Sequence, residues 1–204
     1  MTAMIRYRLH FLILLVAAPV VWLARDVDTS VRIAGFNLSF YFVLIGVLHA
    51  TSVAVSLRNR KSARLIDVLS FVTLAAVWSA ATPILALWSS ALWNLHSEPV
   101  VRGGLDFILI LVTGSTIGAA GYWLLVRTFW LKSLGRMDCL RTVALCVAAT
   151  LVSLVLGMLD QSGKDYYGTL LFTIAWWFAF SLSLYWSEMS EQAKKSTPVI
   201  ANAS

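Results

Sequence analysis

The sequence predicts an all-α fold, a polytopic transmembrane helix bundle with six spans and both termini in the cytoplasm. The first observation is composition: hydrophobic residues make up 59% of the 204 residues, charged residues 13%, and the mean hydropathy is +0.80. Such a chain has too little polar surface to cover a soluble globule. The second is a series of six apolar runs, which approach the roughly 20 residues that a helix needs to cross the hydrocarbon core. The third is the alternation of positive charge between the connecting segments.

The six apolar runs define the expected spans and a single domain, residues 1–187. They cover residues 9–24, 36–57, 65–88, 105–130, 140–159 and 167–187. The polar residues 188–204 are expected to form a disordered cytoplasmic tail. The first run follows Arg6 and Arg8, as the apolar region of a cleaved signal peptide would, but it lacks a convincing small-residue cleavage site before Arg25. We therefore expect an uncleaved first span.

Lysine and arginine residues set the expected orientation, because they are concentrated in the cytoplasmic loops of multi-pass membrane proteins. Of the 16 in the chain, four fall in the loops after spans 1, 3 and 5: Arg25, Arg32, Arg102 and Lys164. The other twelve lie on the opposite side: before span 1, in or next to the loops after spans 2 and 4, and in the tail. This distribution predicts a bacterial inner (cytoplasmic) membrane protein with both termini in the cytoplasm. It also explains the net charge of +6 without a nucleic-acid-binding patch, so nucleic acid is not an expected partner.

The second span carries a polar stripe, which consists of Tyr41, His49, Ser52 and Ser56. At about 100° per residue, these side chains fall within about 120° of arc on one helix face. Hydrocarbon cannot satisfy their hydrogen bonds, so the polar stripe is expected to face the bundle interior. His49 is the ionisable residue that the expected spans place at membrane depth, where such groups often have a function.

Two interpretations of His49 remain open. One is a proton-relay or ligand-binding residue in a polar cavity. The other is a neutral histidine that is hydrogen-bonded to a neighbouring helix. The expected spans place no second ionisable residue at the same depth, which favours the second interpretation.

The fourth span contains a glycine strip, formed by Gly114, Gly118 and Gly121. These residues lie within about 60° of one another on a helix and extend the G-x-x-x-G pattern by one turn. A row of small residues in the fifth span consists of Ala149, Ser153 and Gly157. Missing side chains let two helix backbones approach closely. We therefore expect both sets to be helix-packing surfaces, and a contact between spans four and five is the most direct pairing.

Patterns for catalysis, cofactor binding and metal binding are missing from the sequence. Ser115 lies in the glycine-rich segment, but a serine nucleophile needs a positioned base, and all three histidines precede it in the chain. Cys139 and Cys146 are separated by about 10 Å along a helix, too far for a disulfide, and they lack companion metal ligands. We therefore expect a protein that is not an enzyme, with no catalytic residues, cofactor or metal.

Two functions remain after these exclusions. The first is a non-enzymatic membrane protein that acts through helix packing with a membrane partner or a second copy of itself. An accessory or assembly subunit, or an immunity protein against a pore-forming toxin, would fit this description. The alternative is a small permease or channel component for a neutral or apolar solute, which would use the polar stripe and a kink at Pro83 in the third span.

Overall fold

The computed structural model describes residues 3–24, 30–33, 36–58, 64–94, 104–159 and 166–196. Its helices are α1 (Ala3–Ala24), α2 (Phe40–Arg58), α3 (Leu65–Asn94), α4 (Gly104–Phe129), α5 (Arg136–Leu159) and α6 (Tyr166–Ser196). Two short strands, β1 (Ser30–Ile33) and β2 (Phe36–Ser39), pair antiparallel between α1 and α2. The predicted helical fold class is confirmed, and the β-hairpin is an addition to it.

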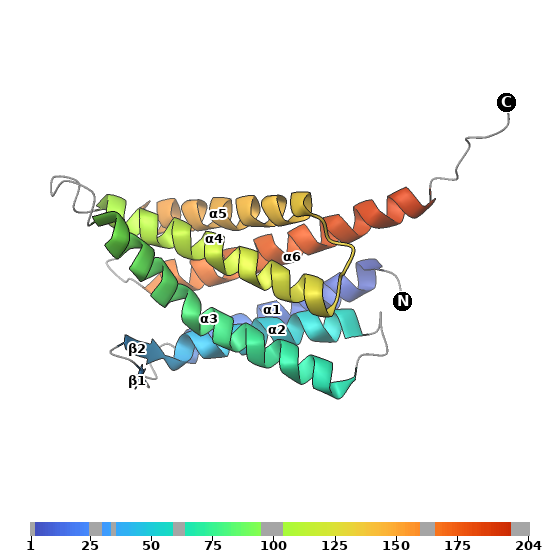
Figure 1. Ribbon diagram of the computed structural model, residues 1–204, viewed down its shortest axis with the longest axis horizontal. Coiled ribbons are helices and arrows are strands. Elements are labelled where there is room, and N and C mark those ends of the chain that lie inside the picture. Colours follow the sequence, from blue (N-terminus) through green and yellow to red (C-terminus); the bar gives the residue numbers. More distant parts are fainter. Residues whose placement is uncertain are drawn as a thin grey trace, which may run out of the picture.

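The six helices run side by side along the long axis of the molecule, and successive helices point in opposite directions (Figure 1). The β-hairpin lies at one end of the bundle, whereas α1 begins and α6 ends at the other. Each helix packs against the next one in the sequence, and α6 packs against α1. The neighbours therefore close into a ring, and side chains that point inward meet at its centre.

The observed boundaries differ from the expected spans at three places. Residues 36–39, which were assigned to the second span, form β2, and the hairpin register runs from Ser30 opposite Ser39 to Ile33 opposite Phe36. The β-branched and aromatic residues of these strands explain why a local hairpin competes with the helix. α1 begins at Ala3 and not at residue 9, and α6 continues to Ser196 through residues assigned to the tail. The rest of that tail lies outside the described residues.

The outer surface of the bundle is apolar. Large hydrophobic side chains such as Leu69 and Val77 on α3 and Leu140 and Val155 on α5 are exposed. A soluble protein rarely leaves so much apolar surface in water, whereas lipid chains solvate it. In the described part of the chain, three helical stretches are long and apolar enough to cross a membrane: Leu65–Ser89, Ile108–Phe129 and Arg136–Gly157. These features are compatible with an integral membrane protein.

Candidate functional site

The glycine strip on α4 faces α3. A Cβ atom added at Gly121 would lie 2.0 Å from Cε2 of the Trp78 indole, and one added at Gly118 would lie 3.3 Å from Cγ2 of Thr82. The Trp78 indole also donates a hydrogen bond to the carbonyl oxygen of Gly118, at 3.3 Å. Gly114 meets α3 in the same way. The strip is therefore filled within the chain.

The pairing of the strip with the small-residue row of α5, expected from the sequence, differs from what the structure shows. α4 and α5 do pack together, but the glycines themselves receive side chains of α3. In the row on α5, Ser153 is buried and donates a hydrogen bond to the carbonyl oxygen of Ala149 at 2.8 Å, while Ala149 and Gly157 are half-buried. The three glycines leave a shallow groove on α4 because they have no side chains. The flat indole ring of a tryptophan can pack into this groove as closely as the backbone of another helix.

A second close helix approach, which the sequence analysis did not single out, joins α2 to α3 at Gly46. A Cβ atom added there would lie 2.7 Å from Cβ of Ser79 and 2.9 Å from both the carbonyl oxygen of Ala75 and Cα of Ala76. The backbones of α2 and α3 are thus in direct contact. A lone glycine in an apolar run makes no repeating pattern, so the sequence offered no signal for it.

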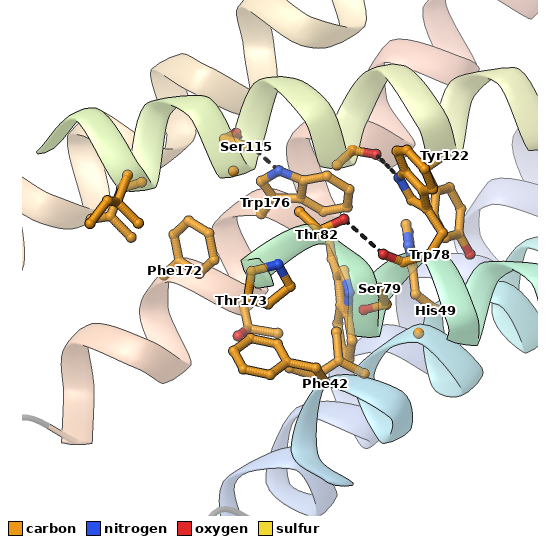
Figure 2. A pocket seen from close by; sticks show the side chains of 18 of the residues that line it. Phe42, His49, Trp78, Ser79, Thr82, Ser115, Tyr122, Phe172, Thr173 and Trp176 are labelled. Carbon is orange, nitrogen blue, oxygen red and sulfur yellow. Dashed lines mark hydrogen bonds between the residues drawn. The ribbon is translucent and has the colours of Figure 1, made fainter. Parts of the chain in front are cut away.

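A cavity of about 430 Å³ lies between α2, α3, α4 and α6 (Figure 2), and it is open at the surface, where Leu87 in its wall has 49% of its surface exposed. Ligand sites in proteins commonly have volumes of about 300–1,000 Å³. Its wall is mainly apolar and aromatic and includes Phe42, Ile45, Trp78, Pro83, Leu87, Ile110, Leu111, Phe172, Trp176 and Trp177. Gly46 and the glycine strip members Gly114 and Gly118 also line it. The same glycines that let the helices approach therefore leave open space beside the contact.

Several polar groups in the cavity wall are already engaged within the protein. The Trp176 indole N–H donates to the Ser115 hydroxyl oxygen at 3.1 Å, and the Thr82 hydroxyl donates to the carbonyl oxygen of Trp78 at 2.8 Å. The serine that the sequence analysis considered as a nucleophile is thus a hydrogen-bond acceptor for a tryptophan. Because these polar groups already have hydrogen-bond partners within the protein, they offer few free donors to a molecule in the cavity.

His49 and Tyr122 lie together at one end of the cavity, and Phe172 lies toward the other (Figure 2). The His49 and Tyr122 rings stack with their centroids 4.7 Å apart, and Trp177 stacks on His49 at 5.7 Å. The side chains of His49 and Tyr122 are buried, with 1% and 3% of their surface exposed. His49 Nε2 and Tyr122 Oη have no hydrogen-bond partner in the part of the chain that the structure describes. Neither atom has accessible surface, so the surrounding side chains seal both of them off from the cavity.

The polar stripe of α2 lies in the interior as far as it is described. His49, Ser52 and Ser56 are all buried, and the Ser56 hydroxyl donates to the carbonyl oxygen of Ser52 at 2.8 Å. The side chain of Tyr41 lies outside the described residues. Among the described residues, His49 Nε2 has no hydrogen-bond partner, and the His49 ring stacks on Tyr122 and Trp177. Both interpretations of His49 remain predictions.

A second buried histidine, which the sequence analysis did not place at membrane depth, lies beside His49. His10 on α1 is 2% exposed, and its ring centroid is 6.2 Å from that of His49. Its Nε2 is hydrogen-bonded to the Ser181 hydroxyl of α6, and its Nδ1 to the Ser52 hydroxyl of α2 at 2.5 Å. His10 therefore ties three helices together. The expected first span placed this residue at the membrane edge, whereas α1 begins at Ala3 and carries it well into the bundle.

The start of α5 forms a polar cluster with α6. Asp138 accepts hydrogen bonds from the Gly135 backbone N–H at 2.8 Å and from the Ser187 hydroxyl at 2.7 Å. The first bond caps the N-terminus of α5, where backbone N–H groups lack partners. Arg141 lies 3.8 Å from the same carboxylate, and Glu188 on α6 is buried. Glu188 belongs to residues 188–204, which the sequence analysis assigned to the cytoplasmic tail.

The described side chains include no cluster of three or more His, Cys, Asp or Glu residues that would hold a metal ion. Cys139 and Cys146 are both free thiols. The arrangement is suited to binding an apolar molecule against the aromatic wall of the cavity. Compared with models of protein families, with curated proteins and with solved structures, the chain matches none of them.

Proposed function

We propose that this protein binds a neutral, largely apolar molecule inside the bundle, as a small permease or binding component of a membrane would. The observation that carries the proposal is the cavity of about 430 Å³ with its aromatic wall. An apolar molecule in the cavity makes dispersion contacts with the side chains of this wall and is stabilised by them.

The charge of the cavity wall supports a neutral ligand. Residues from four helices line it, and among the described residues of this wall there is no Asp, Glu, Lys or Arg. A charged ligand would leave its charge unpaired in an apolar environment, which is costly. The sequence-based alternative of a permease for a neutral or apolar solute thus has structural support in the cavity itself.

The first function expected from the sequence, helix packing with a membrane partner, remains a prediction. An accessory subunit, an immunity protein and a homo-oligomer all belong to this class. One of the features that favoured it was the glycine strip, which α3 fills within the chain. The strip therefore supplies no free surface for a partner helix, and we give the cavity function precedence.

Binding of naphthalene to the purified protein in neutral detergent micelles tests the proposal. Calorimetry with empty micelles as the blank should show saturable binding to the wild type. Leu111 lines the cavity, so Leu111→Trp should fill part of it and weaken binding by about tenfold. Leu124→Trp is the matched control, because Leu124 lies on the same helix with 54% of its surface exposed. Equal affinities of the two variants would contradict the proposal.

We further propose that all six helices cross a bacterial inner membrane with both termini in the cytoplasm. Support comes from the distribution of Lys and Arg, and from the start of α1 and the end of α6 lying at one end of the bundle. Added protease sites at each terminus should be cut only after the cytoplasmic face of membrane vesicles is exposed. Cleavage of a C-terminal site from the external face would contradict this topology.

A further inference from the structure

We propose that the cavity takes up one hydrocarbon chain of a membrane lipid, which enters from the bilayer through the opening beside Leu87. This inference rests on the proposed function and specifies the ligand as a lipid chain. The headgroup of the same lipid stays at the membrane surface, at the end of the bundle that carries the β-hairpin.

The position of the cavity along the helices limits where a ligand can enter. Its wall is built from residues within 42–49 on α2, 78–87 on α3, 110–122 on α4 and 172–177 on α6. Because α2, α4 and α6 begin and α3 ends at the hairpin end of the bundle (Figure 1), the cavity lies mainly in this half. The other half is filled by a buried cluster of side chains that includes Val53, Leu57, Phe71, Val126 and Phe180. The cavity is therefore closed toward that half, and a ligand enters from the hairpin half.

The opening lies at a depth where lipid chains surround the protein. Leu87, the exposed residue of the wall, belongs to Leu65–Ser89, a stretch that is long and apolar enough to cross a membrane. From Leu87, α3 continues for seven residues to Asn94, which is about 10 Å along the helix axis. In the membrane that we propose for this protein, the opening therefore faces hydrocarbon below the headgroup layer.

The side chains around the opening are apolar as well. Leu85 and Trp88, close to Leu87 on α3, are both exposed. Removal of apolar surface from water is favourable, so lipid chains cover these side chains more readily than water does. The space inside the cavity is thus continuous with the hydrocarbon outside it.

The chemistry of the wall matches a hydrocarbon chain. The described wall contains no Asp, Glu, Lys or Arg, and the indoles of Trp78 and Trp176 and the hydroxyl of Thr82 already donate hydrogen bonds within the protein. The wall therefore offers mainly dispersion contacts, which are the contacts that a hydrocarbon chain makes. A polar headgroup would lose its hydration without gaining partners in this wall, so only the chain enters.

Photo-crosslinking in liposomes tests the inference. The full-length protein is reconstituted with a phosphatidylcholine that carries a diazirine at the end of one acyl chain, and mass spectrometry locates the labelled residues after irradiation and digestion. We expect label on Thr82 and Trp176, which line the cavity and are half-buried. Val155 on α5 is the reference, because it is exposed and lies outside the cavity wall. The wall-to-reference ratio is the labelling of Thr82 and Trp176 divided by that of Val155.

Two variants fill the cavity and one control leaves it open. Leu111→Trp on α4 and Ile45→Trp on α2 each add bulk to the wall, so each should lower the wall-to-reference ratio by at least about fivefold. Leu124→Trp is the matched control and should keep the wild-type ratio, because Leu124 is exposed on α4 and lies outside the wall. Naphthalene added to wild-type liposomes should also lower the ratio, since it competes for the cavity. Far-UV circular dichroism checks that each variant is folded.

The outcomes separate this inference from the proposed function. A ratio that falls in folded Leu111→Trp or Ile45→Trp and is unchanged in Leu124→Trp supports the lipid-chain site. If naphthalene binds the wild type saturably in micelles while the wall residues stay unlabelled in liposomes, the cavity function stands and the inference is overturned. An equal ratio in all three variants also overturns it, because the label then reaches the wall residues by another route. Absence of both naphthalene binding and wall labelling would instead refute the proposed function.

Discussion

The contact between α2 and α3 at Gly46 leads to the sharpest stability prediction. In Gly46→Ala the new Cβ atom would lie 2.7 Å from Cβ of Ser79 and 2.9 Å from backbone atoms of Ala75 and Ala76. Ordinary van der Waals contact begins at 3.4 Å, so α3 must move away by more than half an ångström. Overpacking of this kind typically costs about 1–3 kcal/mol. Two of the three close atoms belong to the backbone and cannot be relieved by a change of rotamer.

Gly114→Ala on α4 is the matched control. A Cβ atom there would meet only Cβ of Ala86, at 3.3 Å, which requires almost no movement. Both glycines lie inside helices, so the helix-propensity gain of alanine over glycine, up to about 1 kcal/mol, is common to both variants and cancels. The difference in the free energy of unfolding between them therefore reports the α2–α3 contact.

Unfolding in mixed micelles with increasing SDS, followed by far-UV circular dichroism, measures both variants. We expect Gly46→Ala to be less stable than Gly114→Ala by about 1–3 kcal/mol. Gly46 and Ser79 also line the cavity, so Gly46→Ala should alter naphthalene binding as well. Equal stability of the two variants would show that the helix backbones are not in direct contact at Gly46 and would refute the reasoning.

Two further predictions concern the polar interior. His10→Phe removes the hydrogen bonds to Ser52 and Ser181 and leaves two hydroxyls buried, so it should lower the free energy of unfolding by about 1–3 kcal/mol. The same SDS titration measures this loss of stability. If the two lost hydrogen bonds cause it, His10→Phe should have a much smaller effect in a protein that already carries Ser52→Ala and Ser181→Ala. Asp138→Ala removes the cap of α5 and should cost about 1–2 kcal/mol. Ser187→Ala removes only the other hydrogen bond to Asp138, so it should lower the free energy of unfolding by less. An Asp138→Ala variant as stable as the wild type would contradict the capping role.

The placement of the candidate site was only partly predictable. The polar stripe was correctly expected to lie inside for His49, Ser52 and Ser56, because hydrocarbon offers no partners for their side chains. The partner of His49 was not predictable, since stacking on Tyr122 and Trp177 depends on residues far away in the chain. The cavity was not predictable either, because it is the space that four helices leave between them.

The sequence by itself determined that the chain forms a bundle of apolar helices, and it placed the three glycines of α4 on one face. Composition, the length of each apolar run and helical periodicity are local properties of the sequence. They do not depend on how the helices pack against one another. Only the tertiary structure decided that α3 covers the glycine strip, that His10 binds Ser52 and Ser181, and that a cavity ends at His49 and Tyr122. The physical reason is that, in the membrane that we propose for this protein, lipid tails are as apolar as the helix faces. Helix neighbours are therefore chosen by shape and by individual hydrogen bonds, and a periodic pattern in the sequence specifies neither.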